Sequence, residues 1–234
     1  MLPYPLFLRC AWLGLLAGAV LSAGVDKSQN VLRWAEGRAG CTFSADEDGK
    51  YRYGLWTDDL GIVVAVDADE VRQARLRVES LFAIYLSLRY RGKESLPMNP
   101  ADISLEFVNH YHAVQKAIDP DDFARKLQTK ADAFAAQMAH EIERHPEKQS
   151  MLQAHENDLT KTREFVQSES LRPMTLQPAH PVETGWILFN TNSKWLGDWK
   201  SQEKFLLRIS VANRIVEFPF ALPPSRGDLI LRRR

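Results

Sequence analysis

Two histidines separated by one residue have the spacing in this sequence that best suits metal chemistry. If their segment were a β-strand, His110 and His112 would share a face, because strand side chains alternate with a period of two. Two imidazoles on one face can chelate a metal ion, which can activate water for hydrolysis. The spacing selects no third ligand. A metal-dependent hydrolase is therefore one hypothesis, and paired polar residues on a solvent-facing strand are the commoner alternative.

Other catalytic patterns are not supported by the sequence. The zinc-protease motif needs two histidines four residues apart on a helix, whereas His140 and His145 are five apart. No serine lies in a nucleophile motif of the G-x-S-x-G type. No motif predicts a cofactor, and a serine hydrolase is disfavoured.

Two tryptophans in a predicted loop form a candidate binding site. Trp195 and Trp199 flank a glycine and an aspartate. Exposed aromatic side chains can anchor a protein partner or a glycan. The alternative, which we favour, is that both rings form a lid over one end of the core.

The first residues predict export. Arg9 precedes an apolar run over 11–21, and small residues at 22–24 suit cleavage. We expect a signal peptide over 1–23 and a periplasmic or extracellular location, with a retained anchor as the alternative. After cleavage no transmembrane segment is expected. Cys41 would be the only thiol of the mature chain, which excludes an intramolecular disulfide.

The charge balance argues against nucleic acid as a partner. The 234 residues include 30 basic and 30 acidic ones, so the formal net charge is zero. Such a chain has no overall field to attract nucleic acid or an anionic membrane. No sequence feature defines an oligomeric state.

In most of the chain, apolar residues recur with the spacing that is typical of β-strands. An Asp-Gly pair at 48–49 predicts a hairpin, and short turn-bounded runs with apolar alternation predict strands. We predict eight strands, at 41–43, 51–56, 62–66, 82–90, 103–107, 184–189, 205–209 and 216–220.

A helical hairpin interrupts this pattern. Asp119 and Pro120 form a helix start, and apolar residues then recur at helical spacing until the His145-Pro146 break. The predicted helices are 120–144 and 147–167, roughly 35 and 30 Å long. They exceed the length of a typical strand, so the insertion 119–168 either lies along the domain or projects from it.

These elements predict a mainly β protein with an α insertion, of the α+β class. Short strands without alternating helices favour an antiparallel β-sandwich over 24–224. The arginine-rich tail over 225–234 is expected to be disordered, with a basic contact segment as the alternative.

The closing strands resemble those of a known group. Gly185–Phe189, Phe205–Ile209 and Glu217–Phe220 are similar to core patterns of uncharacterised exported bacterial proteins with an immunoglobulin-like sandwich. The resemblance implies that fold and no active site, because such folds host many functions. Our leading hypothesis is a non-catalytic exported binding or structural module that contacts a protein or other macromolecule through the hairpin or the tryptophan loop. A carrier of an apolar ligand between hairpin and sheet is a further alternative.

Overall fold

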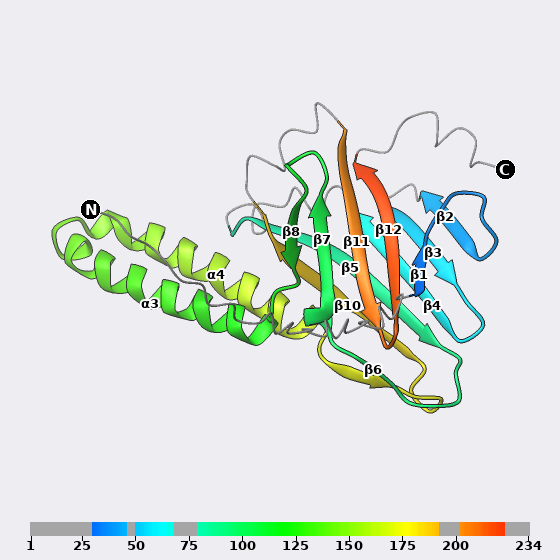
Figure 1. Ribbon diagram of the computed structural model, residues 1–234. Coiled ribbons are helices and arrows are strands. Elements are labelled where there is room, and N and C mark those ends of the chain that lie inside the picture. The colour runs from blue at the N-terminus through cyan, green and yellow to red at the C-terminus, as the bar shows by residue number, and fades with distance from the viewer. Residues whose placement is uncertain (1–29, 46–49, 68–78, 192–201, 223–234) are drawn as a thin grey trace, which may run out of the picture.

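Two five-stranded β-sheets face one another, and a long helical hairpin extends from one side (Figure 1). This computed structural model describes residues 30–45, 50–67, 79–191 and 202–222. The predicted signal peptide 1–23, the loop with Trp195 and Trp199, and the tail 225–234 lie outside the described residues.

Sheet A contains the first and last described strands of the chain. Its order is β1-β12-β11-β7-β8. These strands are β1 Asn30–Arg33, β12 Arg214–Leu222, β11 Glu203–Val211, β7 Ile103–Phe107 and β8 Ala113–Lys116.

Sheet B is a meander extended by one later strand, in the order β10-β5-β4-β3-β2. Its strands are β10 Val182–Asn190, β5 Leu81–Tyr90, β4 Leu60–Asp67, β3 Lys50–Trp56 and β2 Cys41–Ala45. A separate pair joins β6 Leu96–Met98 to β9 Met174–Leu176. The described chain also contains two short 3₁₀ turns, η1 Pro100–Asp102 and η2 Pro146–Lys148.

The core lies between the two sheets. Large side chains from both sheets are completely buried there, including Phe82 of β5 and Phe107 of β7. Aromatic rings connect the layers, since the Phe82 ring lies 5.1 Å from that of Phe205. Burial of this apolar surface is the main force that holds the sheets together.

The α+β, mainly β prediction is confirmed, and each of the eight predicted strands lies in an observed strand. The predicted first hairpin is also confirmed, because β2 and β3 pair antiparallel. The prediction missed β1, β6, β8 and β9, which have only three or four residues each. We predicted an antiparallel sandwich. This prediction was wrong at one edge of sheet A, where β1 pairs parallel with β12.

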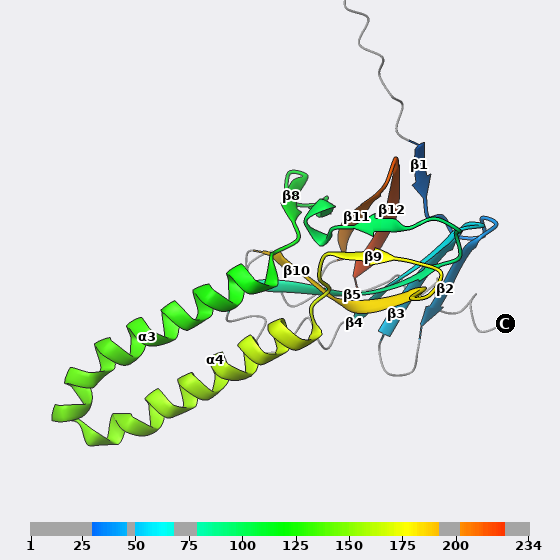
Figure 2. The ribbon, with the colours of Figure 1, turned by 90° about the horizontal axis from the view of Figure 1, so that it is seen from below.

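The predicted helical hairpin is confirmed with small boundary changes. It consists of α3 Pro120–Arg144 and α4 Gln149–Glu169, separated by η2. Both Asp121 and Asp122 donate their amides to the carboxylate of Asp119, which caps α3 as expected. Figure 2 shows that the helices project from the sandwich, which decides between the two predicted placements. Within the described chain, neither helix is long and apolar enough to cross a membrane.

Candidate functional site

Both ends of the hairpin are attached to the free edge of β10. Before α3, the amide of Ile118 donates to the carbonyl of Leu188 at 2.8 Å. After α4, the amide of Leu171 donates to the carbonyl of Trp186 at the same distance. The two attachment points are two residues apart on one strand. The hairpin is therefore an insertion with a single, narrow root.

A small second core fixes this root on the outer face of sheet B. Leu81, Ala83 and Leu188 from the sheet are buried together with Val166 of α4. Half-buried aromatic side chains, including Phe123 and Phe165, pack around them. The outer face of β5 is thus covered where the helices leave the sheet, although its alternation predicted a half-buried strand.

Two ion pairs add to the root. Arg172, just after α4, donates to both carboxylate oxygens of Asp121 in α3 at 2.7 and 3.0 Å. Lys130 of α3 reaches back to Glu79 at 2.7 Å. The pKa of Asp121 lies below its ordinary value because of the hydrogen bond from Arg172. These contacts stabilise the angle at which the hairpin leaves the sheet.

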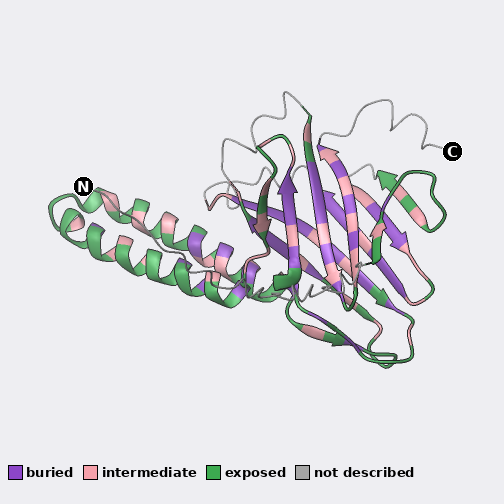
Figure 3. Cartoon of the chain, viewed as in Figure 1, coloured by how far each residue is buried: buried purple, intermediate pink, exposed green. Residues whose placement is uncertain are grey.

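Beyond the root, the two helices contact chiefly one another. The predicted apolar faces meet, and Leu127, Met138, Leu159, Thr162 and Val166 are buried. The Phe134 ring lies 4.2 Å from the His155 ring. Met151, near the tip, is 63% exposed. Figure 3 shows exposed residues along the projecting part and buried ones near the sheets.

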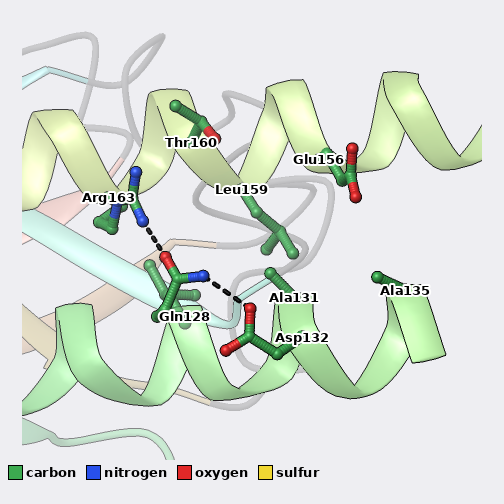
Figure 4. A pocket seen from close by; sticks show the side chains of 9 residues that line it. Gln128, Ala131, Asp132, Ala135, Glu156, Leu159, Thr160 and Arg163 are labelled. Atoms are coloured by element: carbon green, nitrogen blue, oxygen red, sulfur yellow. Dashed lines mark hydrogen bonds between the residues drawn. The ribbon is translucent and has the colours of Figure 1, made fainter.

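A groove of about 230 Å³ opens between the helices. Figure 4 shows it from close by, with Ala131 and Ala135 of α3 opposite Leu159 and Thr160 of α4. Because alanine side chains are short, the backbone of α3 is accessible to close approach from outside. Packed helices have their axes about 8–10 Å apart, and the distance depends on the side chains at the contact.

The borders of the groove are charged. Arg163 donates a hydrogen bond to the side-chain oxygen of Gln128, whose amide nitrogen donates to Asp132 at 2.8 Å (Figure 4). Glu156 borders the groove further toward the tip. The lining residues therefore hold two carboxylates and one guanidinium. This arrangement is acidic overall and suits a basic, amphipathic helix as the bound element.

The histidine pair takes a different geometry from the predicted strand. His110 and His112 lie in the turn between β7 and β8. His110 Nε2 lies 3.2 Å from Glu203, whereas His112 Nδ1 lies 2.5 Å from Glu106. Two different carboxylates thus hold the two imidazoles. Among the described residues no group of three or more side chains is arranged to hold a metal ion.

Glu106 is the best-connected acid near that turn. Its side chain is only 10% exposed and also contacts Arg208 at 2.6 Å. The hydrogen bond with His112, followed by that from Arg208, holds the pKa of Glu106 below its ordinary value. The carboxylate therefore stays ionised at neutral pH and serves as an acceptor on the outer face of sheet A.

Two further histidines are exposed on the hairpin. His140 is exposed on α3, and His145 follows the end of this helix with Nδ1 3.2 Å from Glu147. Both lie on the solvent-accessible part of the hairpin. The hypothesis of a tryptophan platform stays a prediction, because Trp195 and Trp199 lie outside the described residues.

Sequence reasoning missed the groove, although its two walls carry a signal. Gln128, Ala131, Asp132 and Ala135 follow the spacing i, i+3, i+4, i+7, and so do Glu156, Leu159, Thr160 and Arg163. This spacing defines one stripe on each helix. The pairing of the two stripes depends on how the helices align, which the spacing within each helix does not determine.

No family model, curated protein or solved structure matches this chain.

Proposed function

We propose that this protein is an exported, non-catalytic binding module whose helical hairpin contacts a protein partner. The observation that carries the proposal is the projection of the hairpin from a narrow root, with an open groove along it. A helical pair of this length is not needed to cover the sandwich, since only the start of α3 and the end of α4 pack on sheet B. The part of the hairpin beyond the root is exposed, and in this proposal it is the surface that contacts the partner.

The chemistry of the groove favours a helical partner. Ala131 and Ala135 allow a third helix to approach closely, and apolar contact would be made with Leu159. Asp132 and Glu156 would attract lysine or arginine side chains on that helix. The expected partner segment is thus amphipathic and basic, with small apolar residues on its buried face.

Export and an immunoglobulin-like arrangement belong to the same proposal. The signal layout over 1–23 supports a periplasmic or extracellular location. Two facing sheets with a meander in one of them support an immunoglobulin-like sandwich. In this proposal the sandwich is the rigid base and the hairpin is the binding element.

The two alternatives have less support. A hydrolase built on His110 and His112 would need both imidazoles at one ion, whereas each lies beside a different carboxylate. A carrier would need an apolar cavity between hairpin and sheet, where side chains of the second core pack instead. Pockets for drug-sized ligands measure about 300–1,000 Å³, and the groove between the helices measures only about 230 Å³.

Affinity capture from the native envelope tests the proposal with matched variants. Ala131→Arg fills the groove and places a cation beside Asp132. Ala133→Arg makes the same change on the exposed face of the same helix. Capture by the unmodified protein should identify a partner with an amphipathic helix, and crosslinks should join that helix to α3 and α4.

Ala131→Arg should lose the partner, and Ala133→Arg should retain it. Circular dichroism would check that both variants keep their helices. A partner that Ala131→Arg and Ala133→Arg capture equally well, or one crosslinked only to the sheets, would contradict the proposal.

A further inference from the structure

A second hollow lies on the outer face of sheet B, away from the helical groove. It measures about 220 Å³ and is lined by Lys50, Arg52, Ala65, Tyr85 and Trp186. We call these five residues the sheet B hollow. None of them was a candidate in the sequence, because they come from four different strands.

The strand register explains how the hollow forms. Arg52 pairs with Ala65, Ala65 pairs with Tyr85, and Tyr85 pairs with Trp186. Directly paired residues project from the same face of a sheet, so these four side chains form one row across it. Within that row alanine is the only small side chain. Its methyl group is the floor between a cation on one side and two aromatic rings on the other.

The aromatic side of the hollow is held in place. The rings of Tyr85 and Trp186 lie 5.3 Å apart at 71°, an edge-to-face arrangement. The ring of Phe165 in α4 lies 5.9 Å from the ring of Trp186. The carbonyl of Trp186 accepts the amide of Leu171, so its backbone is also fixed. A wall fixed before binding loses little entropy when a ligand packs against it.

The opposite side of the hollow is basic. Lys50 and Arg52 are two residues apart on β3 and therefore share its outer face. Lys50 is the register partner of Asp67 on the neighbouring strand. Arg52 is the register partner of Ala65 at the centre of the hollow. A guanidinium recognises a carboxylate through two parallel hydrogen bonds.

The size of the hollow limits the ligand to one ring. A cavity of about 150 Å³ holds benzene, and this hollow of about 220 Å³ therefore fits a six-membered ring with a short substituent. We propose that the sheet B hollow binds a ring-shaped carboxylate, with the ring against Tyr85 and Trp186 and the carboxylate at Arg52. Both an acidic sugar and an aromatic acid have this chemistry.

Titration calorimetry on the purified full chain tests this proposal and separates the two sources. The probes are glucuronate and benzoate, with methyl glucoside and benzyl alcohol as their uncharged counterparts. We expect saturable binding of at least one acid, at least about tenfold tighter than that of its uncharged counterpart. Binding of glucuronate alone would identify a sugar site, and binding of benzoate alone an aromatic-acid site.

Two variants locate the binding site. Ala65→Leu fills the hollow without changing charge, and Arg52→Gln removes the cation without changing the floor. Each should weaken binding of the acid by about tenfold or more. Arg89→Gln is the matched control, because Arg89 is exposed on the same face of β5 as Tyr85 but does not line the hollow.

The proposal fails if neither acid binds the unmodified protein at millimolar concentration, or if the uncharged counterparts bind equally well. It also fails if Arg52→Gln and Arg89→Gln bind alike, a comparison that stands even if Ala65→Leu does not fold. Loss of this site would leave the hairpin proposal intact, because the groove of the hairpin and the sheet B hollow share no residue.

Discussion

Arg214 donates two hydrogen bonds to the carboxylate of Asp59, at 2.9 and 2.5 Å, across a sequence separation of 155 residues. Asp59 lies in the turn between β3 and β4 of sheet B, and Arg214 begins β12 of sheet A. One bidentate ion pair therefore joins the two sheets at their ends. Thr57 adds a hydrogen bond to the same carboxylate at 2.8 Å.

This ion pair should make stability depend on pH in the acid range. The hydrogen bond from Arg214 lowers the pKa of Asp59 from 3.8 to about 2. Because the pKa is lowered in the folded state, the stabilisation is complete above pH 4 and is lost as the pH falls toward 2. Asp59→Asn should cost about 1 kcal/mol at pH 7, a value limited by solvent screening. Urea unfolding between pH 7 and 2 measures the difference, which should disappear near pH 2.

Asp58→Asn is the matched control, because Asp58 is the exposed neighbour in the same turn. It should change the free energy of unfolding by less than about 0.5 kcal/mol at every pH. The free energy of unfolding of Asp59→Asn is compared with that of the unmodified protein at each pH. If the difference stays constant down to pH 2, the ion pair is not its cause.

The outer part of the hairpin should be dispensable for folding, whereas its root should not. Replacing 136–155 with a short Gly-Ser turn removes mostly exposed residues. We expect the free energy of unfolding to fall by no more than about 1 kcal/mol. Deleting 119–168 would expose Leu81 and Leu188 on sheet B, which are buried at the root, and should cost about 3 kcal/mol or more.

Urea unfolding and binding of a hydrophobic dye would compare the two shortened proteins. Dye binding should rise only after the larger deletion, because only that change exposes the outer face of sheet B. Equal dye binding by both would mean that the root does not cover the sheet as described.

Tyr111 occupies a turn position that should be improved by asparagine. Tyr111 and His112 have φ values of 55° and 57°, in the left-handed region that bulky residues avoid. Tyr111 is fully exposed, so its replacement removes no packing. Tyr111→Asn should raise the free energy of unfolding by about 0.5–1 kcal/mol, since asparagine tolerates this conformation. Tyr111→Ala keeps the penalty of a side chain at positive φ and should give no such gain in urea unfolding.

Gly185 is needed where the chain leaves α4. A Cβ atom at this position would lie 2.8 Å from the amide nitrogen of Leu171 and 3.2 Å from the carbonyl oxygen of Glu169. Both contacts are with backbone atoms, which cannot move aside as the end of a flexible side chain could. Gly185→Ala should therefore cost about 1–3 kcal/mol and speed hydrogen exchange at the Leu171 amide. Thr184→Ala, at the exposed neighbour, should leave both measurements nearly unchanged.

The elements that could be predicted have strong local signals. Asp119 with Pro120 starts α3, and the proline after His145 ends it within the predicted boundary. The longer strands have enough alternation to be recognised. By contrast, β6 and β9 have three residues each, and their pairing joins segments on opposite sides of the hairpin. No local pattern contains that information.

The sites were harder to predict because they depend on alignment between elements. Two stripes of helical spacing become a groove only when Gln128 and Arg163 meet. The sheet B hollow requires the register of four strands. The histidine turn misled us for a different reason. Positive φ values usually require glycine or asparagine, and neither stands at Tyr111 or His112.

The attachment of the hairpin ends to β10 also bears on solubility. The chain has no net charge, so molecules do not repel one another through an overall field. Unpaired strand edges would then invite aggregation. The backbone before α3 and after α4 occupies the free edge of β10, and the edge strands β1 and β2 have only four and five residues. Among the described strands, edge protection thus takes the place of charge repulsion in keeping copies of the chain apart.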